Sequence, residues 1–252
     1  MSDLTWLAAA LFLPLFPFSM LLNQVMPRIR RPWQRIVLLL AWPQVGIALV
    51  TVANGTVPTW VAAWAVATAA LYGFRAIVVR DLGLWIQFIG TSTWALLWLL
   101  AVFASDTGLL PMHALASSLP LVILTLVGVG LERRFGAAYA GVSRGLAQAS
   151  PRLAAVFVVS VLVAVATPPA PGFFTLLAAI IYAMPAAPVV AGVVTVTWLF
   201  WAWSAARLVQ GFIVGTVETR PQSDIGPAQA WLFGLFVAAL SAQGLLLFGK
   251  MP

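Results

Sequence analysis

The sequence contains no cysteine and a single histidine, His113, among its 252 residues. Without cysteine, the chain can form no disulfide bond, no thiolate zinc site and no iron–sulfur cluster. One histidine is too few for a multi-histidine metal site or for a haem held by two histidines of the same chain. We therefore expect this chain to bind no metal and no cofactor.

Charged side chains are also scarce, with 13 lysines and arginines and 6 aspartates and glutamates, or 8% of the chain. A water-soluble surface needs about 25–35% charged residues. Hydrophobic residues make up 63% of this chain, whereas soluble domains contain roughly 45–50%. These proportions exclude a soluble globule and predict an all-α, polytopic helical membrane protein.

The excess of basic over acidic side chains gives the chain a formal net charge of +7. In a soluble protein this excess would suggest nucleic acid as a partner. Here the basic residues lie in short breaks between apolar runs, where the positive-inside rule for membrane proteins accounts for them. No soluble segment could carry a nucleic-acid face, so we expect membrane lipids and no nucleic acid as partners.

Apolar runs follow one another along the whole chain. They cover residues 4–25, 36–52, 57–79, 84–104, 109–131, 153–166, 173–184, 189–214 and 228–248. A crossing takes about 20 apolar residues, so we expect about nine spans. The short run 173–184 lies between Pro171 and Pro185. It predicts a broken helix that crosses the membrane, a feature tolerated where protein or water covers the loose backbone.

Nine crossings would put the two ends of the chain on opposite sides of the membrane. One side would then carry Arg28, Arg30, Arg31, Arg35, Arg75, Arg80, Arg133, Arg134, Arg144, Arg152 and Lys250. The other side would carry Asp3, Asp106, Glu218, Arg220 and Asp224. The positive-inside rule then predicts a bacterial-type inner (cytoplasmic) membrane protein with its N-terminus outside and its C-terminus in the cytoplasm.

Polar side chains inside apolar runs are candidates for function, because burying them in hydrocarbon is costly. His113 and Ser117 share one helix face by their i, i+4 spacing. Pro120 frees a backbone carbonyl nearby. An imidazole can exchange protons near neutral pH. The alternative interpretation is a histidine hydrogen-bonded at the membrane interface.

Three further polar residues have simpler interpretations. Gln87 and Thr91, again at i, i+4, are typical of polar contacts that hold membrane helices together. Arg207 lies about two turns from the end of its run and can extend its charge to the interface. The 12 tryptophans fit interfacial belts, although three of them, Trp198, Trp201 and Trp203, could form a quinone cleft.

Four short stretches carry a family resemblance when they are taken in order. Residues 80–83 read Arg-Asp-Leu-Gly and residues 112–117 read Met-His-Ala-Leu-Ala-Ser. Residues 131–136 read Leu-Glu-Arg-Arg-Phe-Gly, with Gly-Leu at 145–146 and Ser-Pro at 150–151, and residues 167–177 read Thr-Pro-Pro-Ala-Pro-Gly-Phe-Phe-Thr-Leu-Leu. Together they resemble motifs of the antiporter-like membrane subunits. These are the L, M and N type subunits of respiratory complex I, with relatives in Mrp antiporters, membrane-bound hydrogenases and inorganic-carbon pumps.

The resemblance implies an antiporter-like helical core at residues 57–215. A two-helix segment at 1–56 would precede it, and a loop and last helix at 216–252 would follow. It also marks Pro168, Pro169, Gly172 and Phe173 as a broken-helix motif. In that family, lysines carry protons along a polar axis at the membrane midplane. The corresponding residues here are Gly83, Ser117 and Leu176, and the acid that follows the last lysine is replaced by Leu177.

Of the titratable axis, His113 alone remains, and the chain has about half the length of a full family member. A single titratable group cannot form a continuous relay across about 30 Å of hydrocarbon. We therefore expect an accessory, non-enzymatic membrane subunit of a larger energy-coupled complex. Its partner would be a full-length antiporter-like paralogue or a catalytic subunit. The alternatives are an autonomous proton or small-solute transporter and a quinone- or lipid-binding anchor.

Overall fold

The structure is a computed structural model that describes residues 2–29, 31–53, 57–104, 107–142, 144–215 and 223–250. Within these ranges the chain forms helices and turns, with one isolated bridge between Asp81 and Tyr139 and no strand. The predicted all-α class is therefore confirmed. The segment boundaries expected after residues 56 and 215 border residues outside these ranges.

Helices of membrane-crossing length account for much of the bundle. They are α3 (Pro32–Val52), the joined pair α5 (Leu82–Ala95) and α6 (Leu97–Phe103), α7 (Leu110–Phe135), α11 (Pro188–Ile213) and α12 (Pro227–Phe248). The shorter helices are α1 (Ser2–Phe12), α2 (Ser19–Arg28), α4 (Trp60–Ala76), α8 (Leu146–Ala149), α9 (Pro151–Ala164) and α10 (Pro171–Ala183). These lengths and compositions confirm a multi-pass helical membrane protein.

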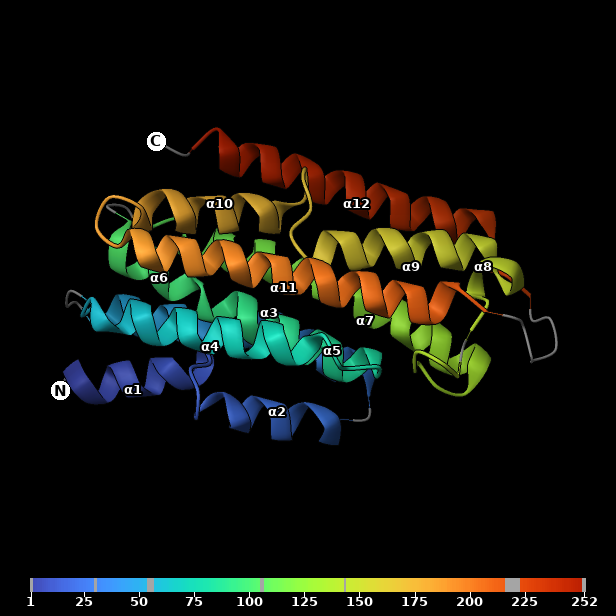
Figure 1. The fold of residues 1–252 in the computed structure, drawn as a ribbon, viewed down its shortest axis with the longest axis horizontal. Helices are drawn as coiled ribbons and strands as arrows, with labels where there is room; N and C mark the ends of the chain where they lie inside the picture. Colours follow the sequence, from blue (N-terminus) through green and yellow to red (C-terminus); the bar gives the residue numbers. More distant parts are fainter. Residues whose placement is uncertain are drawn as a thin grey trace.

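Two passages through the bundle are made by pairs of short helices placed end to end (Figure 1). Helices α9 and α10 have 14 and 13 residues, so each is roughly 20 Å long. Neither spans a hydrocarbon core of about 30 Å alone, whereas the two in line do. Helices α1 and α2 form the second pair, and Pro14 and Pro17 lie in the break between them.

Two sequence-based predictions are therefore wrong. Residues 173–184 do not cross the membrane by themselves, because α10 is the second half of a passage that α9 begins. Residues 4–25 do not form one continuous helix, because the chain leaves the helix at residues 13–18. The predicted count of nine spans is accordingly not supported.

The pairing of α9 with α10 also changes where the chain ends. Figure 1 shows the beginning of α1 and the end of α12 at the same end of the bundle, which we call the terminal end. Lys250 follows α12 there. The opposite end, which we call the charged end, is where α2, α4, α7 and α11 finish and where α3, α5, α9 and α12 begin.

The described arginines gather at the charged end. They are Arg28, Arg31, Arg35, Arg75, Arg80, Arg133, Arg134, Arg144, Arg152 and Arg207. The sequence predicts that Lys250 lies with these arginines and that Asp224 lies at the other end. Both positions are wrong, because α9 and α10 make one passage instead of two, which places Asp224 at the charged end and Lys250 at the terminal end. Arg30, Asp106, Glu218 and Arg220 lie outside the described residues.

Asp224 fixes the beginning of α12 to the beginning of α9. Its carboxylate accepts hydrogen bonds from the backbone N–H groups of Arg152 at 2.8 Å and Leu153 at 3.1 Å, and from that of Ile225. Burial by itself raises the pKa of the Asp224 carboxyl, but these donors and the Arg152 guanidinium hold the pKa below its ordinary value. The carboxylate therefore caps a helix from a distant part of the chain.

We predict that Asp224→Asn lowers the stability of the bundle by about 0.5–1 kcal/mol at pH 7, because it removes the negative charge from the beginning of α9 and one of the two acceptor oxygens. Because the folded-state pKa is lowered, the charged cap stabilises the fold at neutral pH, and this stabilisation decreases as the pH falls below the unfolded-state value near 3.9 and is lost below the folded-state pKa. The thermal unfolding midpoints of the two proteins in detergent should differ at pH 7 and converge towards pH 3.5. A constant difference at both pH values would contradict the capping role.

The absence of cysteine permits a direct test of the topology. We predict that cysteines introduced by Ser2→Cys and Lys250→Cys react with an impermeant maleimide from the same side of the membrane. A cysteine introduced by Arg31→Cys should react from the opposite side, since α1 and α2 make one passage between them. Labelling of Ser2→Cys and Lys250→Cys from opposite sides would contradict the end-to-end pairing of α9 and α10.

Candidate functional site

His113 is buried near the start of α7, with 6% of its surface exposed. Its Nδ1 atom lies 3.0 Å from Oγ1 of Thr175 on α10, and the two atoms share a hydrogen bond whose direction depends on the imidazole tautomer. One turn further along α7, the Ser117 hydroxyl donates to the His113 carbonyl at 3.0 Å. The predicted pair His113 and Ser117 is thus brought together with Thr175.

A small cavity lies beside these residues, at the break between α9 and α10. Its lining includes Ser117, Thr175, Leu176, Gly172 and Thr93. Its volume is about 20 Å³, and a buried water needs about 10–15 Å³ and polar partners. Two positions at which the resembled family carries lysines, 117 and 176, therefore line one water-sized cavity.

Neighbouring helices of this chain cover the broken backbone. The carbonyl of Val165 accepts a hydrogen bond from the indole N–H of Trp198 on α11 at 3.1 Å. The backbone N–H groups of Ala166, Thr167 and Ala170 donate to carbonyls of the same stretch. Helix α12 approaches at Gly244, where an added Cβ would lie 2.9 Å from the Pro169 carbonyl oxygen. Pro168, Pro169 and Pro171 have no N–H to satisfy, so the break needs no second chain to cover these groups.

The broken-helix motif itself lies at the start of α10. Pro168 and Pro169 precede the helix, and Gly172 and Phe173 form its first turn. The ring of Phe173 packs against Trp198, with 6.1 Å between ring centroids. Through Phe173 the motif packs α10 against α11, and through Gly172 it lines the small cavity.

A larger pocket of about 370 Å³ opens at the charged end, between α2, α3, α5 and α7. Its lining includes the charged residues Arg35, Asp81 and Glu132, and Gln87 and Thr125 line it as well. Gly83, a third position at which the resembled family has a lysine, is also in the lining. We call this pocket the charged mouth.

Helix α5 connects the charged mouth to the small cavity. Gln87 lines the mouth and Thr93 lines the cavity, and these residues are about 9 Å apart along the helix axis. Between them, Thr91 is fully buried. The Gln87 Oε1 and Thr91 Oγ1 atoms are buried without a hydrogen-bond partner among the described residues. We call Gln87, Thr91, Thr93, Ser117, Thr175 and His113 the polar seam.

The structure does not support the interpretation of Gln87 and Thr91 as contacts that hold helices together, because these two oxygens bond no neighbouring helix in the described ranges. Tryptophan–serine pairs take that role. Indole N–H groups of Trp85, Trp94 and Trp201 donate to the hydroxyls of Ser204, Ser118 and Ser92, respectively, across helix pairs. The hydroxyl pattern alone could not identify these partners.

The predicted interfacial position is wrong for several tryptophans. Trp85, Trp94, Trp98 and Trp201 are among the largest fully buried side chains. Trp203, by contrast, is 62% exposed on α11, so it points away from Trp201. The cavity that Trp201 lines has a volume of about 20 Å³, too small for a quinone ring. Arg207 does not join the polar seam and lines a separate pocket.

Comparison with known proteins shows which solved structures share this fold. No protein-family model matches the chain, and no curated protein sequence matches it. A chain of respiratory complex I from Thermus thermophilus with bound NADH matches with a TM-score of 0.80 and 22% identity, over 98% of this chain and 54% of that chain. A chain of the Mrp complex from Dietzia sp. matches with a TM-score of 0.80 and 17% identity, over 97% and 56% of the two chains.

A third match is a chain of the membrane-bound sulfane sulfur reductase, an archaeal respiratory membrane complex. It has a TM-score of 0.78 and 16% identity, over 94% of this chain and 51% of that chain. The chain therefore spans about half the length of these chains and shares their fold. The resemblance seen in the four motifs is confirmed at the level of the fold. The likeness extends beyond residues 57–215 to nearly the whole chain.

We predict that Thr175→Val destabilises the bundle by about 1 kcal/mol, because it removes the hydroxyl that pairs with His113 while keeping the side-chain shape. Thr195→Val is the matched control, since the Thr195 hydroxyl donates to the Ala191 carbonyl of its own helix and to no other helix among the described residues. Thermal unfolding in detergent measures both. Equal midpoints for the two variants would contradict a structural role of the His113–Thr175 contact.

Proposed function

We propose that the chain is an accessory membrane subunit of a larger energy-coupled, ion-translocating complex and that it does not conduct protons by itself. One observation carries this proposal. Gly83 in the charged mouth and Ser117 and Leu176 in the small cavity stand at the positions where the resembled family has lysines. Buried lysines can relay protons because burial lowers their pKa towards neutrality; a glycine or a leucine cannot titrate.

The spacing of ionisable groups supports the same conclusion. Within the described residues of the polar seam, His113 is the one ionisable side chain. Thr125, which marks the inner lining of the charged mouth, lies about 18 Å from His113 along α7. Hydroxyl and amide groups along that distance pass a proton only through water. A relay within this chain would therefore lack intermediate titratable groups.

The proposed setting is a bacterial-type inner membrane. The arginines of the charged end favour the cytoplasmic side by the positive-inside rule, which puts both described ends of the chain outside. We propose this orientation in place of the expected cytoplasmic C-terminus. Large apolar side chains such as Trp231 and Leu235 on α12 are exposed and face lipid or a neighbouring subunit. A full-length antiporter-like subunit or a catalytic subunit is the proposed partner, in a complex for inorganic-carbon uptake, hydrogen metabolism or Mrp-type exchange.

An autonomous proton or small-solute transporter is a second candidate, and one observation favours it. The unpartnered oxygens of Gln87 and Thr91 lie between the charged mouth and the cavity. Buried polar atoms are normally hydrogen-bonded, so water that satisfies these atoms would extend the mouth towards His113. The two candidates differ in whether this hydrated path conducts without a partner.

We predict that the purified chain, reconstituted in liposomes with a pH-sensitive dye, gives no proton leak and no cation-driven proton exchange above empty liposomes. Gln87→Leu and Thr91→Val, which remove the unpartnered oxygens, should leave this baseline unchanged. A proton flux that is present in the natural chain and lost in His113→Ala would establish the transporter instead. Thr195→Val, away from the seam, is the control for non-specific leak.

A further inference from the structure

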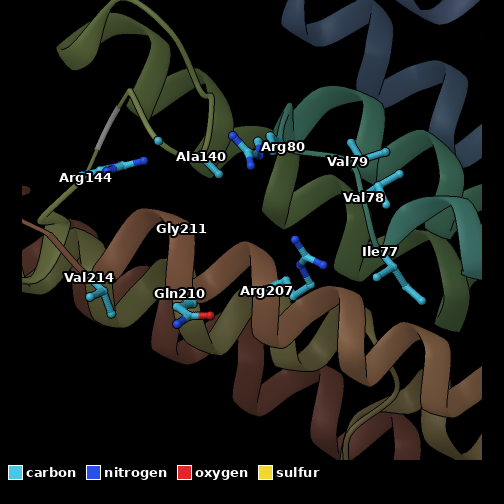
Figure 2. A pocket seen from close by; sticks show the side chains of 11 residues that line it. Ile77, Val78, Val79, Arg80, Ala140, Arg144, Arg207, Gln210, Gly211 and Val214 are labelled. Atoms are coloured by element: carbon cyan, nitrogen blue, oxygen red, sulfur yellow. The ribbon is translucent and has the colours of Figure 1, made fainter.

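Three arginines line one pocket at the charged end of the bundle. The pocket has a volume of about 260 Å³ and lies between the turn after α4, the loop around residue 141 and the last turns of α11. Figure 2 shows the side chains of Arg80, Arg144 and Arg207, each from one of these segments, around the pocket. Gln210 adds an amide, and no carboxylate of the described residues belongs to the lining. We call it the arginine pocket.

Backbone contacts hold the three segments together. The Ala140 N–H donates to the Arg80 carbonyl at 2.8 Å. Ala140 in turn lies against Gly211 on α11, where an added Cβ would come within 2.8 Å of the Ala140 Cβ. Gly215 has a φ of +133°, and a Cβ there would lie 2.9 Å from the Arg144 Cβ. The pocket is therefore built before any ligand binds, with the stem of Arg144 packed over a glycine.

The three guanidinium groups have no hydrogen bond or ion pair with the described part of the chain, unlike other arginines at this end. Arg35 and Arg134, for example, donate to backbone carbonyls. Like charges that face one pocket repel each other. An arrangement of planar, five-donor groups without an internal acceptor is suited to an oxyanion, and phosphate is the one that arginine clusters match best.

The depth of the pocket and its apolar edge indicate where that phosphate comes from. Arg207 lies about 9 Å before the end of α11, measured along the helix. Trp203 and Leu199 lie four and eight residues before Arg207 on the same face of α11, and both are exposed. Val78, 72% exposed, lines the pocket, and the exposed Phe74 packs edge-on against Phe200. An apolar seam therefore runs from the pocket into the membrane between α4 and α11.

We propose that the arginine pocket binds the phosphate of an anionic phospholipid, whose acyl chains lie along the apolar seam between α4 and α11. Basic pockets between membrane helices on the cytoplasmic side suit anionic headgroups. Arginine at headgroup depth also keeps its charge at the interface while its stem lies against apolar surface. The site is separate from the polar seam and does not depend on whether the chain conducts protons.

The test uses the full chain in mild detergent, titrated with short-chain phosphatidylglycerol, cardiolipin or phosphatidylcholine and followed by native mass spectrometry. Arg80→Gln, Arg144→Gln and Arg207→Gln are combined in one variant. The matched control combines Arg28→Gln, Arg31→Gln and Arg133→Gln, which removes the same charge from the same end of the bundle. We expect the pocket variant to lose at least about tenfold in affinity for anionic lipid, the equivalent of one charged hydrogen bond. The control should change by less than about twofold.

Arg144→Lys separates a built site from diffuse attraction, because it keeps the charge but loses the fork of donors. We expect it to weaken anionic-lipid binding severalfold. Equal losses in the pocket variant and the matched control, or an unchanged Arg144→Lys, would overturn the site. Inorganic phosphate that displaces the lipid at micromolar concentration would show that a free anion is the ligand and would overturn the lipid assignment.

Glu218 follows Gly215 closely in the sequence and lies outside the described residues. Asp81, next to Arg80 in the sequence, lines the charged mouth instead, so Glu218 is the competing carboxylate to test. If the natural chain binds no anionic lipid and Glu218→Gln does, the pocket is neutralised by its own chain and the proposal is wrong. Equal binding by the natural chain and Glu218→Gln supports the external phosphate.

Discussion

Prolines at 168, 169 and 171 divide one membrane passage into α9 and α10, and hydrocarbon offers no water to satisfy a backbone that leaves the helix. Much of the surrounding structure follows from this constraint. Trp198 donates to a carbonyl at the break, and α12 comes close enough at Gly244 to require a glycine. The water-sized cavity and the His113–Thr175 contact lie beside the same break. The interruption thus lies next to the polar groups that α7 and α10 bring together inside the bundle.

The same constraint governs the distribution of charge. Because α9 and α10 make one passage, the loop before α12 lies at the charged end, where Asp224 caps α9. The charged mouth and the arginine pocket occupy this end as separate sites, one with acidic and basic side chains and the other with arginines alone. Only the mouth leads along α5 towards the cavity.

The sequence was sufficient to predict the class, most helix positions and the polar pair on α7. Apolar runs of crossing length and the i, i+4 spacing of His113 and Ser117 are visible without a structure. The pairing of α9 with α10 was not predictable, because a proline-bracketed apolar run reads equally as a short crossing and as half of one. Thr175 was missed as the partner of His113 because the contact joins residues 62 positions apart. The buried tryptophans were missed since an all-apolar helix does not reveal which face meets lipid.

The chain keeps the fold of antiporter-like subunits over about half of their length and has no lysine at the three positions where the resembled family carries them. The most direct test is the mass of the chain purified in gentle detergent from its own membrane, with identification of every copurifying subunit. We expect a hetero-complex that contains a longer antiporter-like membrane subunit or a catalytic subunit at fixed stoichiometry. A stable, monodisperse monomer that retains transport activity after this purification would contradict it.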